Sequence, residues 1–195
     1  MTIRKVRISD AAAIAAIYNE YIVGTTISFE QRPLTTAEMS ERISAISSSY
    51  PYFVCEDAGN VVGYCYAHAW KERAAYKHTY ETTIYISPAH HGKGIGRLLM
   101  ERLIETCRNA GCHSLIACIT GDNQPSIRFH EQLGFVVHLS SIRSAENSAD
   151  GSMLLTMSYC SHSHTRFDLM QPVDPSPPPR PTPVYNNQTE SHYPS

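Results

Sequence analysis

The seven residues His91-Gly92-Lys93-Gly94-Ile95-Gly96-Arg97 lie between an apolar stretch and a segment with helical periodicity. Their three glycines let the backbone approach a bound group closely, and successive backbone N–H groups in such a loop can point at an anion. A helix that begins here adds the partial positive charge of its N-terminus, and Lys93 and Arg97 add full charges. We expect this loop to bind a pyrophosphate group; the alternative is a tight turn that needs glycine for its geometry alone. Its spacing differs from that of the P-loop and of the dinucleotide-binding fingerprint.

The stretches around this loop predict a sheet flanked by helices. Alternating apolar and polar residues predict strands, and apolar residues three and four apart predict helices. The predicted order is strand 3–8, helix 11–23, a helix from 36, a hairpin of 52–56 and 61–67, strand 79–86, helix 95–109, strand 115–119 and helix 126–133. This order predicts one α/β or α+β domain with a single sheet.

The composition fits one globular domain and excludes some function classes. The chain has 195 residues, 42% of them hydrophobic, and a formal net charge of −2. Without an excess of cations to displace counterions, binding of nucleic acid by bulk charge is not expected. No apolar run reaches the roughly 18 residues of a membrane helix, and the first residues lack the apolar core of a signal peptide. Six cysteines without a CxxC pair predict reduced core thiols in a cytoplasmic protein.

The last part of the chain differs in composition from the rest. Eight of the 12 prolines follow position 170, and residues 186–195 are polar. Such a segment buries too little apolar surface to offset the entropy of ordering. We therefore predict a folded domain over residues 1–160 and a disordered tail over residues 161–195. His162 and His164 in this tail lack further ligands at metal-binding spacing, and no metal site is expected.

Several motifs together resemble one enzyme family. The glycine-rich loop after an apolar strand is similar to the acyl-CoA signature of the GNAT acetyltransferases, although His91 stands where that family usually has Gln or Arg. From residue 3 to about residue 137 the chain resembles the subfamily of phosphinothricin and methionine sulfoximine N-acetyltransferases. The stretches that carry this resemblance are Ala13-Ile14-Ala15-Ala16-Ile17-Tyr18-Asn19, Trp70-Lys71-Glu72-Arg73-Ala74-Ala75-Tyr76, Tyr80-Glu81-Thr82-Thr83-Ile84-Tyr85-Ile86-Ser87-Pro88 and His130-Glu131-Gln132-Leu133-Gly134-Phe135.

The resemblance implies a GNAT fold, with a mixed and mostly antiparallel sheet, and acetyl-CoA as the cosubstrate. It implies that backbone N–H groups of the strand before the loop bind the pantetheine and polarise the thioester carbonyl. The cofactor-binding residues that it assigns are Ile84, Tyr85, Ile86, Gly92, Lys93, Gly94, Ile95, Gly96, Arg97, Asn123 and Ser126.

Two residues are candidates for acid–base chemistry. Glu81 lies inside an apolar strand, where poor hydration favours proton uptake by a carboxylate and makes it a usable base. The resemblance places the general base of the subfamily here; the alternative is a salt-bridged strand acid. His130 stands where many relatives have a Tyr that protonates the leaving thiolate, and an imidazole can donate or relay a proton. The alternative is a histidine that packs on its helix near the cofactor.

The expected substrate is a small amino acid or an analogue of one, acetylated on its α-amino group. Trp70, Arg73 and Tyr76 precede the Glu81 strand; the planar fork of an Arg suits a carboxylate or phosphinate, and aromatic rings can line a pocket. A solvated loop Arg is the alternative. Phe29 resembles part of the substrate loop of the subfamily. Two other functions stay open: acetylation of another small amine or an antibiotic, and acyl-CoA binding with impaired catalysis.

Beyond residue 137 the resemblance stops. The family pattern continues with Gly-Lys-Phe-Gly-Arg-Trp-Leu-Asp and a further apolar strand, whereas residues 144–150 lack strand-like alternation. Read one base out of phase, codons for Ala145 to Met153 can encode that pattern. We hypothesise that the chain from near residue 138 onward is a frameshifted reading of the last two strands, which would leave a sheet edge without its partner. The subfamily resemblance implies a homodimer, and the altered C-terminal part puts the homodimer in question. Charge and hydropathy indicate no nucleic-acid or membrane partner.

Overall fold

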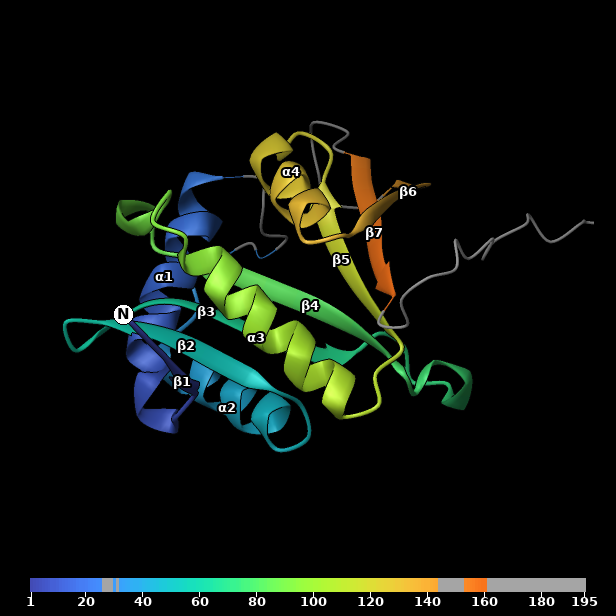
Figure 1. The fold of residues 1–195 in the computed structure, drawn as a ribbon. Helices are drawn as coiled ribbons and strands as arrows, with labels where there is room; N and C mark the ends of the chain where they lie inside the picture. Colours follow the sequence, from blue (N-terminus) through green and yellow to red (C-terminus); the bar gives the residue numbers. More distant parts are fainter. Residues whose placement is uncertain (26–29, 31, 144–152, 161–195) are drawn as a thin grey trace, which may run out of the picture. The chain divides into compact units, whose positions relative to one another are not determined.

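The structure, a computed structural model, describes residues 1–25, 30, 32–143 and 153–160. Within these residues, one sheet has the strand order β1-β2-β3-β4-β5-β7-β6 (Figure 1). The strands are β1 (Thr2–Lys5), β2 (Tyr52–Asp57), β3 (Asn60–Ala69), β4 (Thr79–Ile86), β5 (Ser114–Thr120), β6 (Val136–Arg143) and β7 (Met153–Cys160). The α-helices are α1 (Ala11–Gly24), α2 (Thr36–Ser47), α3 (Ile95–Asn109) and α4 (Gln124–Gln132), and three 3₁₀ turns are η1 (Ile8–Asp10), η2 (Ala74–Tyr76) and η3 (Pro88–His90).

Buried side chains on both faces of the sheet hold the helices in place. Leu99 and Leu103 of α3 are fully buried in a cluster on one face. Ile14 of α1 and Ile43 of α2 pack with Tyr64 of β3 in a second cluster on the other face. Only β4 and β5 pair in parallel; every other pair of neighbouring strands is antiparallel. The predicted α/β fold with a mostly antiparallel sheet is therefore confirmed.

Local hydrogen bonds explain where two elements differ from their predicted bounds. The first strand ends at Lys5 because the carboxylate of Asp10 accepts the backbone N–H of Arg7 at 2.7 Å and a guanidinium N–H of Arg4 at 2.8 Å, which fixes the turn η1. Helix α4 begins at Gln124, two residues earlier than predicted, because the side chain of Asn123 caps it by accepting the backbone N–H of Ser126.

The sheet opens between its fourth and fifth strands. β4 and β5 pair only through Thr79↔Ser114, Tyr80↔Leu115 and Glu81↔Ile116, although both strands continue beyond these residues. The second half of β4 keeps its partner β3, and the second half of β5 keeps its partner β7. The two strands therefore diverge after Glu81, and one edge of each is left without a partner strand facing it.

The C-terminal part contradicts one expectation from the sequence. β7 pairs with the whole of β5, from Ser114↔Cys160 to Thr120↔Leu154, and β6 pairs with β7. The expectation that a sheet edge lacks its partner strand here is therefore wrong. Leu155 and Met157 are buried in the α3 cluster, and Thr156 and Ser158 alternate with them, so residues 153–160 carry a usable strand pattern. The out-of-phase reading of residues 145–152 and the predicted tail over 161–195 lie outside the described residues.

The prediction of core thiols holds for four of the six cysteines. Cys55, Cys65, Cys107 and Cys112 are buried, Cys118 is half-buried and Cys160 is exposed, and all six are free. Burial raises the pKa of the Cys65 and Cys107 thiols. None of the described helices is long and apolar enough to cross a membrane.

Candidate active site

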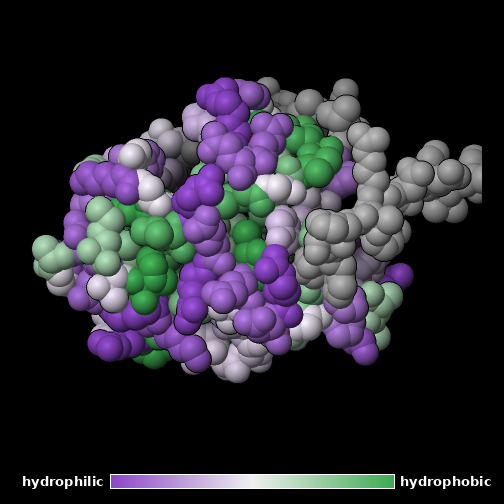
Figure 2. All heavy atoms as spheres, in the orientation of Figure 1, coloured by the Kyte–Doolittle hydropathy of each residue, from purple (hydrophilic) through white to green (hydrophobic). Residues whose placement is uncertain are grey.

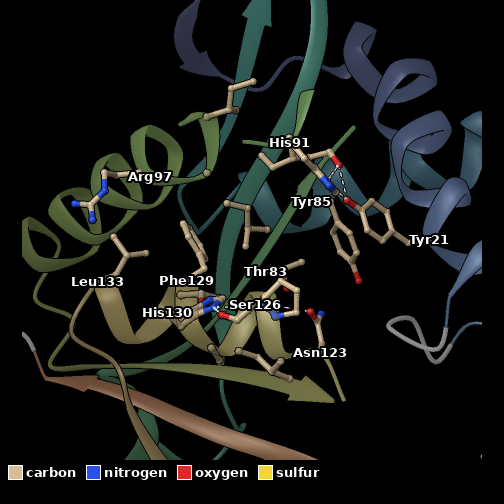
Figure 3. A pocket seen from close by; sticks show the side chains of 18 of the residues that line it. Tyr21, Thr83, Tyr85, His91, Arg97, Asn123, Ser126, Phe129, His130 and Leu133 are labelled. Atoms are coloured by element: carbon tan, nitrogen blue, oxygen red, sulfur yellow. Dashed lines mark hydrogen bonds between the residues drawn. The ribbon is translucent and has the colours of Figure 1, made fainter. Parts of the chain in front are cut away.

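A cavity of about 1120 Å³ occupies the opening between β4 and β5 (Figure 3). Its lining comes from both strands, from the loop that leads into α3, from α1 and from α4. The outer face of α3, by contrast, carries hydrophilic side chains (Figure 2). The cavity brings together most of the predicted site residues, namely Glu81, Ile84, Tyr85, Ile86, Gly92, Gly94, Ile95, Gly96, Arg97, Asn123, Ser126 and His130.

Two different structural constraints require glycine in the loop. Gly92 and Gly94 have φ angles of 74° and 77°, a left-handed conformation in which a side chain is strained. Gly96 lies on α3 close to α4, and a Cβ added there would be 3.2 Å from the ring of Phe129. The loop thus places the N-terminus of α3, with its unsatisfied N–H groups, at the cavity wall. Arg97 also lines the cavity, whereas Lys93 does not.

The exposed edge of β4 presents backbone donors to the cavity. The N–H of Ser87 bonds the carbonyl of Val62 on the β3 side at 2.9 Å. Because N–H directions alternate along a strand, the N–H groups of Ile84 and Ile86 point to the opposite side, where β5 has diverged. Tyr85 contributes its side chain to the cavity instead of its N–H group.

The far wall has a buried hydroxyl that lacks a partner. Oγ1 of Thr120, at the end of β5, has no hydrogen-bond partner among the described residues, and the residue is 4% exposed. Buried hydroxyls nearly always have a partner, so a polar group of a bound molecule fits here. Asn123 and Ser126 line the same cavity. Sequence reasoning missed Thr120, because an apolar strand that ends in a Thr carries no distinctive signal.

Glu81 contributes a carboxylate to the cavity wall. Glu81 is the last residue of β4 that pairs with β5, and its side chain is about a quarter exposed. Its one ion-pair contact among the described residues is His68 on β3, with Nε2 3.8 Å from Oε2. Cys118 of β5 lies on its other side. Burial, together with the negative charge of Glu81 and a hydrogen-bonding contact with it, raises the pKa of that thiol to about 12. No Lys or Arg pairs with Glu81 in the described part of the chain, so the alternative of a salt-bridged strand acid rests on the contact with His68.

Comparison with known proteins identifies the family. The model of the acetyltransferase (GNAT) family matches residues 12–135. This chain belongs to the GNAT acetyltransferase family. It is 38% identical over 133 residues to the phosphinothricin N-acetyltransferase of Streptomyces viridochromogenes, covering 68% of this chain and 73% of that protein. It is also 38% identical over 141 residues to the L-methionine sulfoximine/L-methionine sulfone acetyltransferase of Salmonella typhimurium, covering 70% and 81%.

A solved structure of the same family has the same fold. The GNAT superfamily phosphinothricin acetyltransferase from Sinorhizobium meliloti, in complex with acetyl-CoA, superposes with a TM-score of 0.77 at 34% identity. The match covers 82% of this chain and 87% of that one. The family and its fold, which the sequence motifs predicted, are thereby confirmed for this acetyltransferase.

Burial favours the neutral form of the His130 imidazole in this acetyltransferase. It is 3% exposed, and its Nδ1 lies 2.8 Å from the carbonyl oxygen of Ser126, so Nδ1 carries the proton and donates it. Its ring makes edge contacts with Phe129 and Phe135. Burial lowers the pKa of His130. A neutral ring with its proton on Nδ1 has none to give from Nε2, so this geometry favours the packing alternative, and the thiolate-protonating role stays a prediction.

A polar contact between α1 and the end of β4 was missed by the sequence reasoning. The Tyr21 hydroxyl donates to the carbonyl of Ile86 at 2.5 Å, and His91 Nε2 lies 2.9 Å from that hydroxyl and 3.1 Å from the same carbonyl (Figure 3). In the sequence, His91 stands out only as a departure from the family pattern, and Tyr21 carries no distinctive signal. Together they fix the backbone at the point where the acetyltransferase loop begins.

The predicted substrate residues on the β3–β4 loop do not line the cavity. Trp70, Arg73 and Tyr76 are absent from its walls, and Arg73 is exposed. The loop has contacts of its own, since Nζ of Lys71 lies 5.6 Å from the Trp70 ring centroid and 5.4 Å from that of Tyr76. Through these contacts Lys71 holds the two rings near each other on the loop that precedes β4. Phe29 lies outside the described residues.

Glu30, which follows Phe29 in the sequence, lines the cavity. Its Oε1 lies 2.7 Å from Nη2 of Arg42 on α2. No group of three or more His, Cys, Asp or Glu side chains within the described ranges could hold a metal ion.

Proposed function

We propose that this acetyltransferase transfers an acetyl group from acetyl-CoA to the α-amino group of a small amino acid or analogue of the phosphinothricin or methionine sulfoximine and sulfone type. One observation carries the proposal. A single cavity runs along the unpaired edge of β4, from the glycine loop at one end to Glu81 at the other. We call the part formed by the loop, Ile84, Ile86 and Asn123 the cofactor end, and the part at Glu81 and Cys118 the amine end.

The cofactor end fits the chemistry of acetyl-CoA, which supplies an activated acetyl group as a thioester. The loop and the N-terminus of α3 would hold the pyrophosphate. Backbone N–H groups at Ile84 and Ile86, with the partnerless hydroxyl of Thr120, match the amide-rich pantetheine arm. The cavity exceeds the usual 300–1,000 Å³ of a small-molecule site, as a cosubstrate together with an amine requires.

The amine end supplies the acid–base chemistry. Glu81 would take a proton from the substrate's ammonium group, because only the free amine has a lone pair that can attack the thioester carbonyl. A β4 backbone N–H at Ile84 or Ile86 would stabilise the oxyanion that forms, since it is a fixed donor at a site with little water. The reaction then proceeds by direct attack with both substrates bound.

A thiol-release screen tests the proposed function. Purified protein is supplied with acetyl-CoA and, in turn, phosphinothricin, methionine sulfoximine, methionine sulfone, the protein amino acids, and small amines and antibiotics that lack a carboxylate. We expect amine-dependent release of CoA that is highest with the amino-acid analogues, and a product acetylated on the α-nitrogen by mass spectrometry. Release of CoA only with amines that lack a carboxylate would instead favour acetylation of another small amine or an antibiotic. Acetyl-CoA binding without release in any reaction favours a binding protein.

Assembly and location form a separate part of the proposal. The resemblance supports a homodimer, and light scattering after size-exclusion chromatography would show a mass twice that of the chain. Six free cysteines support a reducing, cytoplasmic environment, because exposed thiols such as Cys160 would oxidise elsewhere.

A further inference from the structure

His68 stands directly beside the carboxylate of the amine end. It is the cross-strand partner of Glu81, with His68 on β3 and Glu81 on β4, so the two side chains project from the same face of the sheet. Nε2 of His68 lies 3.8 Å from Oε2 of Glu81. His68 lies just outside the cavity lining and is about a third exposed, so it adjoins both the cavity, through Glu81, and the solvent.

The hydrogen bond at the other ring nitrogen decides what Nε2 can do. Nδ1 of His68 lies 2.9 Å from the carbonyl oxygen of Ala69, and a carbonyl can only accept. Nδ1 therefore carries the proton of the neutral ring, and Nε2 has a bare lone pair. Nε2 and the Glu81 carboxylate are then two acceptors that face each other without a hydrogen to share.

A nitrogen with two N–H groups satisfies both acceptors at once. Two atoms 3.8 Å apart can each lie about 3 Å from one nitrogen, which is the length of an ordinary N–H hydrogen bond. We propose that Glu81 and His68 together seat the ammonium group of the substrate, with one N–H donated to each, and that protonation of His68 closes this seat. This inference rests on the proposed function and names the residue that completes its amine site.

The seat accounts for both protons that the nitrogen loses. Glu81 takes the first and leaves a free amine that still donates to His68. The amine forms the N–C bond at the thioester carbonyl, and Nε2 of His68 takes the second proton from the attacked nitrogen as the C–S bond breaks. Of the two protons now held by Glu81 and His68, one goes to the departing thiolate and the other to solvent, so the charges balance.

A doubly protonated His68 inhibits binding through the same geometry. Because Nδ1 already donates to the Ala69 carbonyl, the second proton would sit on Nε2, aimed at Glu81. The imidazolium would pair with the carboxylate and repel the ammonium of the substrate. The other titratable groups around the pair are Tyr66 of β3 and Cys118 of β5, with Arg42 of α2 acting on Tyr66. Burial raises the pKa of both Tyr66 and Cys118, so these two side chains stay neutral at neutral and acid pH.

Two substitutions separate the two halves of the proposal. His68→Asn keeps a donor for the Ala69 carbonyl but has no acceptor at the position of Nε2. His68→Gln places an amide oxygen near that position but cannot titrate. His113→Gln changes an exposed histidine outside the cavity lining and serves as the control. Steady-state rates are measured from pH 5.5 to 9 with saturating acetyl-CoA and an amine that the wild type accepts.

We expect the KM for the amine to rise about tenfold or more in His68→Asn at pH 8.5, because a hydrogen bond to a charged group is lost. In His68→Gln the KM stays nearer the wild-type value, and kcat/KM for the amine falls less steeply toward acid pH. The KM for acetyl-CoA is unchanged in both, which also shows that the variants fold. Wild-type activity with unchanged profiles in both variants overturns the inference alone. A wild type without activity on any amine overturns the proposed function, and this inference with it.

Discussion

The two ends of the cavity are built from different chemical groups. The cofactor end consists mainly of backbone: a glycine loop with two positive φ angles, a helix N-terminus and the N–H groups on the free edge of β4. The amine end consists of side chains that can titrate or share protons, with Glu81 between His68 and Cys118. Both ends lie in the opening between β4 and β5, but backbone groups line one end and side chains line the other.

This difference has a consequence for how each end responds to change. A backbone site is insensitive to pH and to most side-chain exchanges, and it is sensitive to a Cβ where glycine is required. A side-chain site responds to pH and to isosteric exchanges that leave the backbone untouched. The KM for acetyl-CoA should therefore be nearly independent of pH, while kcat/KM for the amine should vary with it.

The largest effect is expected at the amine end. Glu81→Gln keeps the shape of the side chain but cannot take a proton, so kcat should fall about 10²–10⁴-fold, the usual contribution of a general base. The KM for acetyl-CoA should hardly move. Steady-state kinetics at pH 8 measure both values. Wild-type turnover in this variant would show that Glu81 has a structural role only.

The next effect is expected at the cofactor end. Gly94→Asp forces a side chain into a backbone with a φ of 77° and brings a negative charge beside the expected pyrophosphate. The KM for acetyl-CoA should rise by about tenfold or more while the KM for the amine stays close to wild type. Gly59→Asp is the matched control, because Gly59 has a φ of 82° in the β2–β3 turn outside the cavity lining. An equal rise in both variants would mean that strain alone is responsible.

A smaller effect is expected at His130, in the wall of the cofactor end. His130→Asn keeps a donor for the Ser126 carbonyl and cannot titrate, so kcat should stay within about threefold of wild type if the side chain only packs. A fall of about a hundredfold or more would instead support the thiolate-protonating role.

The same residue makes the stability of the fold depend on pH. Because the folded protein lowers the pKa of His130, the unfolded chain binds its proton at higher pH than the folded chain does. The wild type should therefore keep its stability above the ordinary titration range of histidine and lose part of it as the pH falls through that range. Melting temperatures measured from pH 8 to pH 5 should fall less steeply in His130→Asn.

The local signals in the sequence predicted the glycine loop and the strand before it, and they were insufficient for contacts between elements far apart in the chain. The bounds of β4 and α3 could be predicted because apolar periodicity and glycines specify them over short distances. The pairing of His68 with Glu81 could not, because it depends on the register of β3 against β4 and not on spacing along the chain. β7 was missed because its pattern becomes useful only against β5, some 40 residues earlier. The place of the β3–β4 loop depends on contacts that no local pattern encodes.

The smallest effect is expected from Arg73, and it tests where the amine end stops. Arg73 is exposed and does not line the cavity, so Arg73→Ala should change the KM for phosphinothricin by no more than about twofold. If the loop instead brings this guanidinium to the acidic group of the substrate, the lost charge-assisted hydrogen bonds should raise that KM about tenfold or more. Methionine sulfone and its carboxamide distinguish the two cases, because only the carboxylate form can make such a bond. An equal and small response to both substrates, with Lys77→Ala as a control on the same loop, would place the acid-binding group of this acetyltransferase elsewhere in the cavity.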